Sequence, residues 1–108
     1  MTNLLTRMQA LVDGGEVHLS AHGFRELAAD GILLDEVTGG IRAATVVEEY
    51  SEFAKGPSIL VLQWDRMGRP LHVLWGIPKG HESPAVIVTA YRPDPGRWSE
   101  DFMRRRKP

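Results

Sequence analysis

Three apolar segments in the second half of the chain constrain its fold more than any other feature. They span residues 58–64, 71–77 and 85–91, and short connections rich in Gly, Pro and Asp separate them. Apolar runs of this length between turn-forming residues are typical of β-strands. An earlier run at 46–50 predicts one more strand. Because the connections are short, consecutive strands are expected to pair antiparallel.

The first half of the chain shows helical spacing instead. Apolar residues recur with the period of a helix over 4–12. Ser20 is a suitable N-cap for a second helix over 21–30, which Gly31 is expected to end. A third helix is predicted over 34–44. These elements predict an α+β fold in which two or three N-terminal helices pack on a four-stranded antiparallel sheet.

The second helix and the C-terminus complete this sequence-based prediction. In the second helix, Ala21, Phe24 and Ala28 are expected to lie on one side, with Leu27 alongside. Ser99 is expected to cap a last helical turn before the basic tail at 104–108. The length of 108 residues is typical of one domain that spans the whole chain.

The composition excludes several classes of protein. There is no cysteine, so neither a disulfide nor a thiolate metal site can form. No apolar run approaches the roughly 20 residues that span a membrane, and residues 1–7 lack the pattern of a signal peptide. No P-loop, GxSxG or GxGxxG motif supports a nucleotide or serine hydrolase. A cytoplasmic protein without a cofactor is therefore expected.

Charge is distributed unevenly along the chain. Residues 1–61 carry four Lys or Arg against nine Asp or Glu, whereas residues 62–108 carry nine against five. A basic half can bind a polyanion with one face of the protein. The alternative is that most of these charges only solvate the surface.

His72 is the most informative single residue. In an extended strand it projects with Leu74 and Gly76 to the face opposite Trp75. A histidine on a sheet face can exchange protons near neutral pH and serve as a general acid or base. The alternative is a buried histidine that makes structural hydrogen bonds.

Three further groups of residues suit the binding of a phosphate. His22 follows Ser20 at a helix start, where free amides attract anions, although a capping or packing role is the alternative. At the end of the last strand, Arg92 could clamp a phosphate, and Tyr91 could donate a hydrogen bond or stack on a base. Trp98 and the basic tail extend this region, unless the tail is only a solvated terminus. His18 and His22 lack the partner carboxylates of a metal site, so no metal is expected.

The chain resembles a known bacterial family. The resemblance covers about residues 17–106 and depends most on the segments GRPLHV (68–73) and TAYRPDP (89–95) in this order. The family is catalogued as domain of unknown function 4258. The resemblance implies the fold shared by barnase, EndoU, colicin nucleases and RelE-type toxins. It also implies an endoribonuclease toxin with a partner, a small antitoxin that carries a zinc finger or a helix-turn-helix.

The resemblance also implies candidate site residues and shows one departure. The catalytic candidates that it implies are His22, His72, Tyr91 and Arg92, and it implies Thr89 as a substrate-binding candidate. The residues themselves add further substrate-binding candidates, Arg25, Trp98, Arg104 and Arg105. Many family members carry basic residues at the positions of Glu26 and Asp30. Arg25 could substitute for the first of these, whereas acidic residues beside a phosphate would repel RNA.

Three classes of function follow from these features. The first is metal-independent RNA cleavage, in which the 2′-hydroxyl attacks the adjacent phosphate, His72 or His22 moves a proton, and Arg92 stabilises the charge. It requires His72 and Tyr91 on one sheet face with His22 directed toward them. The second is a non-catalytic binding or regulatory protein whose acidic first half is the working surface. The third is a small-molecule enzyme that pairs His22 with Glu26.

Overall fold

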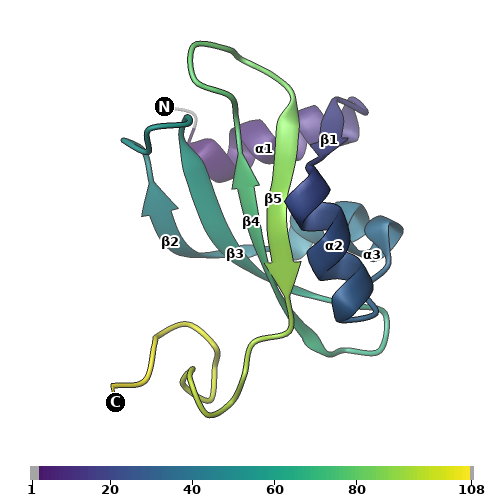
Figure 1. The fold of residues 1–108 in the computed structure, drawn as a ribbon, viewed down its shortest axis with the longest axis vertical. Coiled ribbons are helices and arrows are strands. Elements are labelled where there is room, and N and C mark those ends of the chain that lie inside the picture. The colour runs from purple at the N-terminus through teal and green to yellow at the C-terminus, as the bar shows by residue number, and fades with distance from the viewer. Residues whose placement is uncertain (1–2, 108) are drawn as a thin grey trace.

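The computed structural model describes residues 3–107, which form three α-helices, one 3-10 helix and five strands. The helices are α1 (Leu4–Asp13), α2 (Ala21–Ala29), α3 (Leu34–Gly40) and the 3-10 helix η1 (Ile41–Ala43). The strands are β1 (Val17–Leu19), β2 (Thr45–Tyr50), β3 (Ser58–Trp64), β4 (Pro70–Gly76) and β5 (Ala85–Tyr91). The strands form one sheet in the order β1-β5-β4-β3-β2 (Figure 1). The α+β class predicted from the sequence is confirmed.

The prediction of a four-stranded antiparallel sheet is wrong in one respect. β2 to β5 pair antiparallel as expected, but β1 adds a fifth strand that runs parallel to β5. Val17 pairs with Ala85 and Leu19 pairs with Ile87. A strand of three residues is too short to show a period of its own, and its partner lies far along the sequence. The sheet is therefore mixed.

Alternation along the strands separates a core face from an open face. Leu71, Val73 and Trp75 of β4 are completely buried on the core face. Figure 1 shows α1 and α3 behind the sheet and α2 alongside β5 on the front. Within the core, Trp75 Nε1 donates to Gln63 Oε1 over 2.9 Å, and Gln63 Nε2 donates to the carbonyl of Val37 over 2.8 Å. Each of these buried polar atoms thus has a partner, as burial requires.

Helix α2 begins where the sequence predicted, and its buried face contains Leu27 but not Phe24. Ser20 caps it, because its Oγ accepts from the Gly23 amide over 2.9 Å. The buried residues of α2 are Gly23 and Leu27, whereas Phe24 is 63% exposed. A Cβ at Gly23 would lie 2.6 Å from the carbonyl oxygen of Ile87. The helix therefore packs against β5 through a position without a side chain, which hydrophobic spacing could not reveal.

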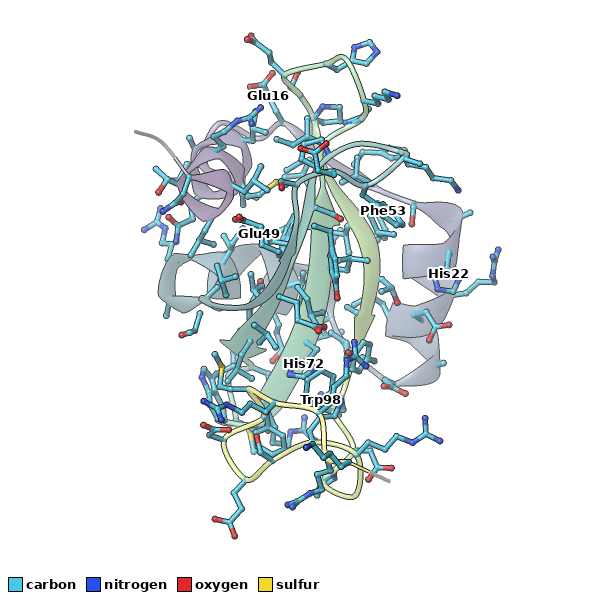
Figure 2. All side chains as sticks on the ribbon, turned by 90° about the vertical axis from the view of Figure 1, so that its left-hand side faces the viewer. Glu16, His22, Glu49, Phe53, His72 and Trp98 are labelled. Carbon is cyan, nitrogen blue, oxygen red and sulfur yellow. The ribbon has the colours of Figure 1, made fainter. Side chains whose placement is uncertain are left out.

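The C-terminal segment contains no helical turn after Ser99. Residues 93–107, named here the C-terminal strap, form a compact loop closed by an isolated bridge between Trp98 and Arg105. The Arg106 amide donates to the carbonyl of Arg97, and the Ser99 amide donates to that of Arg104, both over 2.8 Å. Figure 2 shows the strap folded against the end of the sheet where His72 lies.

Candidate functional site

His72 and Tyr91 face each other across β4 and β5. The antiparallel register pairs the two residues directly, so their side chains share one face of the sheet. Tyr91 Oη lies 3.1 Å from His72 Nδ1. This pairing agrees with the sequence-based expectation for the two residues, and their face is the one opposite Trp75.

The hydrogen bonds of His72 fix its tautomer. Its Nε2 lies 2.8 Å from the backbone carbonyl of Phe102, and a carbonyl can only accept, so Nε2 carries the proton. In the neutral ring Nδ1 then accepts, and the Tyr91 hydroxyl is the donor. Phe102 presents its carbonyl with a φ of 62°, a left-handed conformation that residues other than glycine rarely adopt. The strap therefore meets His72 through a strained residue.

Trp98 covers His72 from the side away from the core. The two ring centroids lie 4.3 Å apart with the planes at 84°, and His72 is completely buried. Burial lowers the pKa of His72 because the imidazolium loses water, although the hydrogen bond to Phe102 opposes this. His72 thus has no ring nitrogen open to a substrate. The structural role that the sequence left as an alternative describes its contacts here.

A charged network anchors the strap to β2. The Arg105 guanidinium carbon lies 4.7 Å from the centroid of the Trp98 ring. Arg105 Nη2 donates to Glu48 Oε1 over 2.9 Å, and the Tyr50 hydroxyl donates to the same oxygen over 2.7 Å. The hydrogen bond from Arg105 lowers the pKa of Glu48. The network joins the far edge of the sheet to the residue that covers His72.

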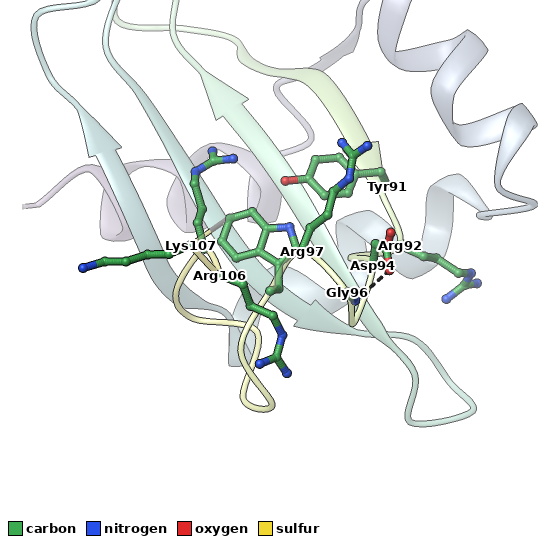
Figure 3. A pocket seen from close by; sticks show the side chains of 9 residues that line it. Tyr91, Arg92, Asp94, Gly96, Arg97, Arg106 and Lys107 are labelled. Carbon is green, nitrogen blue, oxygen red and sulfur yellow. Dashed lines mark hydrogen bonds between the residues drawn. The ribbon is translucent and has the colours of Figure 1, made fainter.

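A groove of about 630 Å³ opens beside the end of β5 and the strap (Figure 3). We name it the basic groove, and it is lined by Tyr91, Arg92, Asp94, Gly96, Arg97, Trp98, Arg105, Arg106 and Lys107. Five of these nine residues are cationic and one is acidic. The basic second half of the sequence is therefore concentrated on one part of the surface.

Three cations of the basic groove have no carboxylate partner within the described residues. Among residues 3–107, no carboxylate lies within ion-pair distance of Arg97, Arg106 or Lys107. Arg106 Nε donates to a neutral acceptor, the Pro95 carbonyl, over 2.8 Å. The carboxylate of Asp94 accepts from the Gly96 amide over 2.8 Å, the contact dashed in Figure 3. The groove is thus electropositive and suited to phosphate groups.

Arg92 is held by carboxylates that sequence reasoning did not connect to it. Its Nη1 donates to Asp65 Oδ2 over 3.0 Å, and its backbone amide donates to Asp30 Oδ2 over 2.9 Å. Arg69 Nε donates to the same Asp65 oxygen over 2.9 Å. Figure 3 shows the Arg92 side chain directed away from Arg106 and Lys107. Its charge is therefore paired rather than offered to a phosphate.

The structure does not bring His22 and His72 together. His22 is exposed on α2, and its Nε2 lies 3.6 Å from Glu26 Oε1. It lines a different hollow, whose lining includes Leu74, two residues along β4 from His72, but not His72 itself. Figure 2 shows His22 on the helix at the side of the sheet, away from His72 at the end of the sheet. The site that required both histidines in one place is not formed.

The remaining candidates divide between the groove and other surfaces. Trp98 and Arg105 line the basic groove, as the sequence suggested. Thr89 is half-buried on the same sheet face and pairs with Leu74, away from the groove lining. Arg25 is exposed on α2 and Arg104 is exposed on the strap. Neither of these two arginines lines the groove.

Three residues of the site were missed in the sequence. Phe102 contacts His72, and Glu48 contacts Arg105. Both contacts form only because the strap folds back onto the sheet, and no local sequence pattern predicts this. Asp65 did carry a signal, since an aspartate that opens a turn often accepts from the amides that follow. Its Oδ1 accepts from the amides of Met67 and Arg69 over 2.8 and 2.9 Å.

Two further features concern metal ligands and membrane-spanning helices. Over residues 3–107, the acidic and histidine side chains form no group of three or more that could hold a metal ion. Over the same residues, none of the helices has the length and apolar character to cross a membrane.

The comparison with protein families places this chain. A family model described as Domain of unknown function (DUF4258) matches residues 19–92, about two thirds of the chain. The chain belongs to this family. The match contains His22, His72, Tyr91 and Arg92 and leaves the whole strap outside. Neither the search of curated proteins nor that of solved structures found a match.

Proposed function

We propose that this member of the family binds RNA in the basic groove and cleaves it without a metal ion. The observation that carries the proposal is the groove itself, where Arg97, Arg106 and Lys107, which form no ion pair with residues 3–107, line the same groove as Tyr91 and Trp98. Cations bind the phosphates of single strands, and aromatic rings stack on their bases. The family resemblance, which implies a fold shared with RelE- and barnase-like nucleases, favours RNA as the substrate.

Tyr91 links the groove to His72 in the proposed reaction. The 2′-hydroxyl attacks the adjacent phosphorus and the bond to the 5′-oxygen of the next nucleotide breaks. The products are a 2′,3′-cyclic phosphate and a 5′-hydroxyl, whose oxygen takes its proton from water. Tyr91 Oη takes the proton of the 2′-hydroxyl while its own proton passes to His72 Nδ1 over the 3.1 Å hydrogen bond. Burial raises the pKa of Tyr91, so the phenol retains a proton to pass. His72 is then a positioning residue that acts through Tyr91.

The charge that develops on phosphorus requires a cation in the groove. Arg92 was the sequence-based choice, but its guanidinium pairs with Asp65. Arg97 and Arg106 line the same groove, pair with no carboxylate of residues 3–107, and are better placed for this role in the proposal. Asp30, which seemed a source of repulsion, accepts from the backbone of Arg92 instead.

The binding half of the proposal is tested with a labelled single-stranded RNA. Replacing Arg97, Arg106 and Lys107 by Ala should weaken binding at least tenfold and reduce the salt slope by about 2, given about 0.7 per lost phosphate contact. The control variant replaces three exposed cations outside the groove, Arg25, Arg42 and Lys79. Equal losses in both variants would show that binding follows net charge, not the groove.

The cleavage half is tested on the same RNA. Tyr91→Phe keeps the ring and removes the hydroxyl, so turnover should fall by roughly 10²-fold or more while affinity stays unchanged. The wild-type products should carry 2′,3′-cyclic phosphates, and EDTA should have no effect. RNA that is bound in the groove but left intact, with and without ribosomes, would support the non-catalytic alternative.

The toxin reading adds a partner to the proposal. A small antitoxin with an acidic segment would cover the basic groove and exclude RNA from it. Expression of the protein alone should then arrest growth, and expression of the neighbouring gene should restore it. Unimpaired growth on expression of active protein would argue against a toxin.

A further inference from the structure

A second hollow of about 480 Å³ lies on the open face of the sheet, and His72 is not among its lining residues. Its floor is formed by β3, β4 and β5 through Ser58, Leu74, Gly76 and Val88. We name it the Ser58 hollow. Most of its floor is apolar, and its volume falls within the range of about 300–1,000 Å³ typical of small-molecule sites. None of its lining residues belongs to the basic groove.

Ser58 gives this hollow its one unexplained polar group. The residue is 4% exposed, and its Oγ is buried without a hydrogen-bond partner. Among the described residues it is the only buried side-chain nitrogen or oxygen atom left in that state. A buried hydroxyl without a partner is unfavourable and needs an explanation. A ligand oxygen in the hollow would supply the missing partner.

Glycine keeps the floor of the hollow open next to this hydroxyl. Gly76 pairs directly with Ser58 in the sheet, so the two share the open face. A Cβ at Gly76 would lie 3.4 Å from Val88 Cγ2 and 3.6 Å from the Ser58 Cβ, in ordinary contact with both. Packing therefore does not require glycine here, whereas a side chain would take up space in the hollow.

The mouth of the hollow carries positive charge. Lys55 lines it from the β2–β3 loop and His22 lines it from α2. No carboxylate among residues 3–107 lies within ion-pair distance of Lys55, whereas His22 lies near Glu26. An anionic group at the mouth would meet the ammonium of Lys55.

We propose that the Ser58 hollow binds a small aromatic or alicyclic carboxylic acid that also carries a hydroxyl or carbonyl oxygen. The apolar body fills the space over Leu74 and Val88, the oxygen reaches Ser58 Oγ, and the carboxylate meets Lys55. A serine hydroxyl turns between staggered rotamers, so Oγ can reach a ligand without movement of the strand. This site is separate from the proposed RNA groove and does not depend on it.

Three matched probes test the ligand chemistry by calorimetry on the full chain. They are 6-hydroxy-2-naphthoate, 2-naphthoate without the hydroxyl, and 2-naphthol without the carboxylate. The first should bind most tightly, and loss of either group should weaken binding about five- to tenfold. Equal affinities for the three probes, or no binding at millimolar concentration, would overturn the proposal.

Two variants test the assigned contacts. Ser58→Ala should raise the melting temperature of the free protein, because it removes the unpaired buried hydroxyl, and should abolish the advantage of the hydroxylated probe over 2-naphthoate. Lys55→Ala should weaken both carboxylates and leave 2-naphthol unchanged. A Ser58→Ala protein that melts lower and keeps the full preference for the hydroxylated probe would show that the hydroxyl is structural, which overturns the proposal.

Discussion

Arg92 at the end of β5 donates from Nη1 to Oδ2 of Asp65, which opens the turn between β3 and β4, over 3.0 Å. The Asp65 side chain has no exposed surface. Its two oxygens accept four hydrogen bonds in all, from Arg92, the side chain of Arg69 and the amides of Met67 and Arg69. The carboxylate therefore fastens the end of β5 to a turn that is 27 residues away in sequence.

Protonation of Asp65 should weaken these hydrogen bonds only at an unusually low pH. Burial alone would raise the pKa of Asp65, but the hydrogen bonds from Arg69, Met67 and Arg92 outweigh it and lower the pKa to about 2. Because the folded pKa lies below the unfolded value of about 3.9, Asp65 stabilises the fold fully above pH 4 and loses this effect as the pH falls toward 2. Urea unfolding of wild type and of Asp65→Asn between pH 2 and 6 measures the contribution of Asp65 to the free energy of unfolding.

The difference in unfolding free energy between wild type and Asp65→Asn tests this prediction. Asp65→Asn should be less stable than wild type at pH 6, and the difference should shrink toward pH 2. A difference that stays constant over this range would place the effect of Asp65 in packing instead of charge.

Asp65 also shows where sequence reasoning ends. The segment from Asp65 to Gly68 identified the turn, because these residue types suit the required backbone, and Gly68 has a φ of 76°. The partner Arg92 belongs to another strand, and only the assembled sheet brings it near. Local chemistry therefore predicted the turn, whereas the ion pair that removes Arg92 from the phosphate site depends on tertiary structure.

A second pH dependence should arise from His72. Its pKa is lowered by burial, so the unfolded chain binds more protons than the folded one as the pH falls below about 6.5. Stability should be full above this value and should decline toward pH 5. His72→Gln cannot titrate, and its unfolding free energy should change less between pH 7.5 and 5. The control is His81→Gln, a substitution in an exposed loop.

The burial of His72 changes one expectation from the sequence. A residue off the apolar face of a strand is expected to contribute little packing, so replacement by Ala should be tolerated. In the structure His72 is completely buried and holds Tyr91 and Phe102 by hydrogen bonds. His72→Ala should therefore destabilise the fold by about 2 kcal/mol or more, because it leaves these two groups unpaired. An activity assay of this variant needs a measurement of folding beside it.

The strap explains why the site could be predicted only in part. The alternation of apolar residues in β4 and β5 was enough to predict that His72 and Tyr91 share one face of the sheet, because side chains alternate between faces in every strand. No period exists in residues 93–107, which are held by turns and by contacts of single residues such as Trp98 on His72. For the same reason the helical turn predicted at Ser99 is wrong, and the sequence left both a binding role and a solvated terminus open for the basic tail.

Removal of the Trp98 ring should expose His72. Trp98 is 4% exposed and covers the imidazole, so Trp98→Ala should cost about 3 kcal/mol of unfolding free energy. The variant should also make His72 reactive toward diethylpyrocarbonate, which wild type should resist at this residue. Peptide mass mapping measures the modification. Phe24→Ala, at a ring that is 63% exposed, should change stability by less than about 0.5 kcal/mol. Reaction of wild-type His72 as fast as His81 would contradict the cover.

Gly56 lies where two loops meet above the Ser58 hollow. The Ile77 amide donates to the Pro57 carbonyl and the Lys79 amide donates to the Lys55 carbonyl, each over 3.0 Å. Gly56 adopts a φ of 124°, and a Cβ there would lie 2.0 Å from the carbonyl oxygen of Ile77. Both its conformation and its surroundings exclude a side chain.

Gly56→Ala should therefore be far more damaging than alanine at another glycine of positive φ. Gly80 has a φ of 80°, and a Cβ there would meet nothing within 4 Å, so Gly80→Ala isolates the backbone cost of about 1–2 kcal/mol. Gly56→Ala adds a collision with backbone atoms that cannot turn aside, and it should lose at least about 3 kcal/mol. Urea unfolding, monitored by Trp fluorescence, compares the unfolding free energies of Gly56→Ala and Gly80→Ala. If Gly56→Ala does not fold, loss of soluble protein in this variant alone gives the same answer, whereas equal stability of both variants would show that the two loops separate readily.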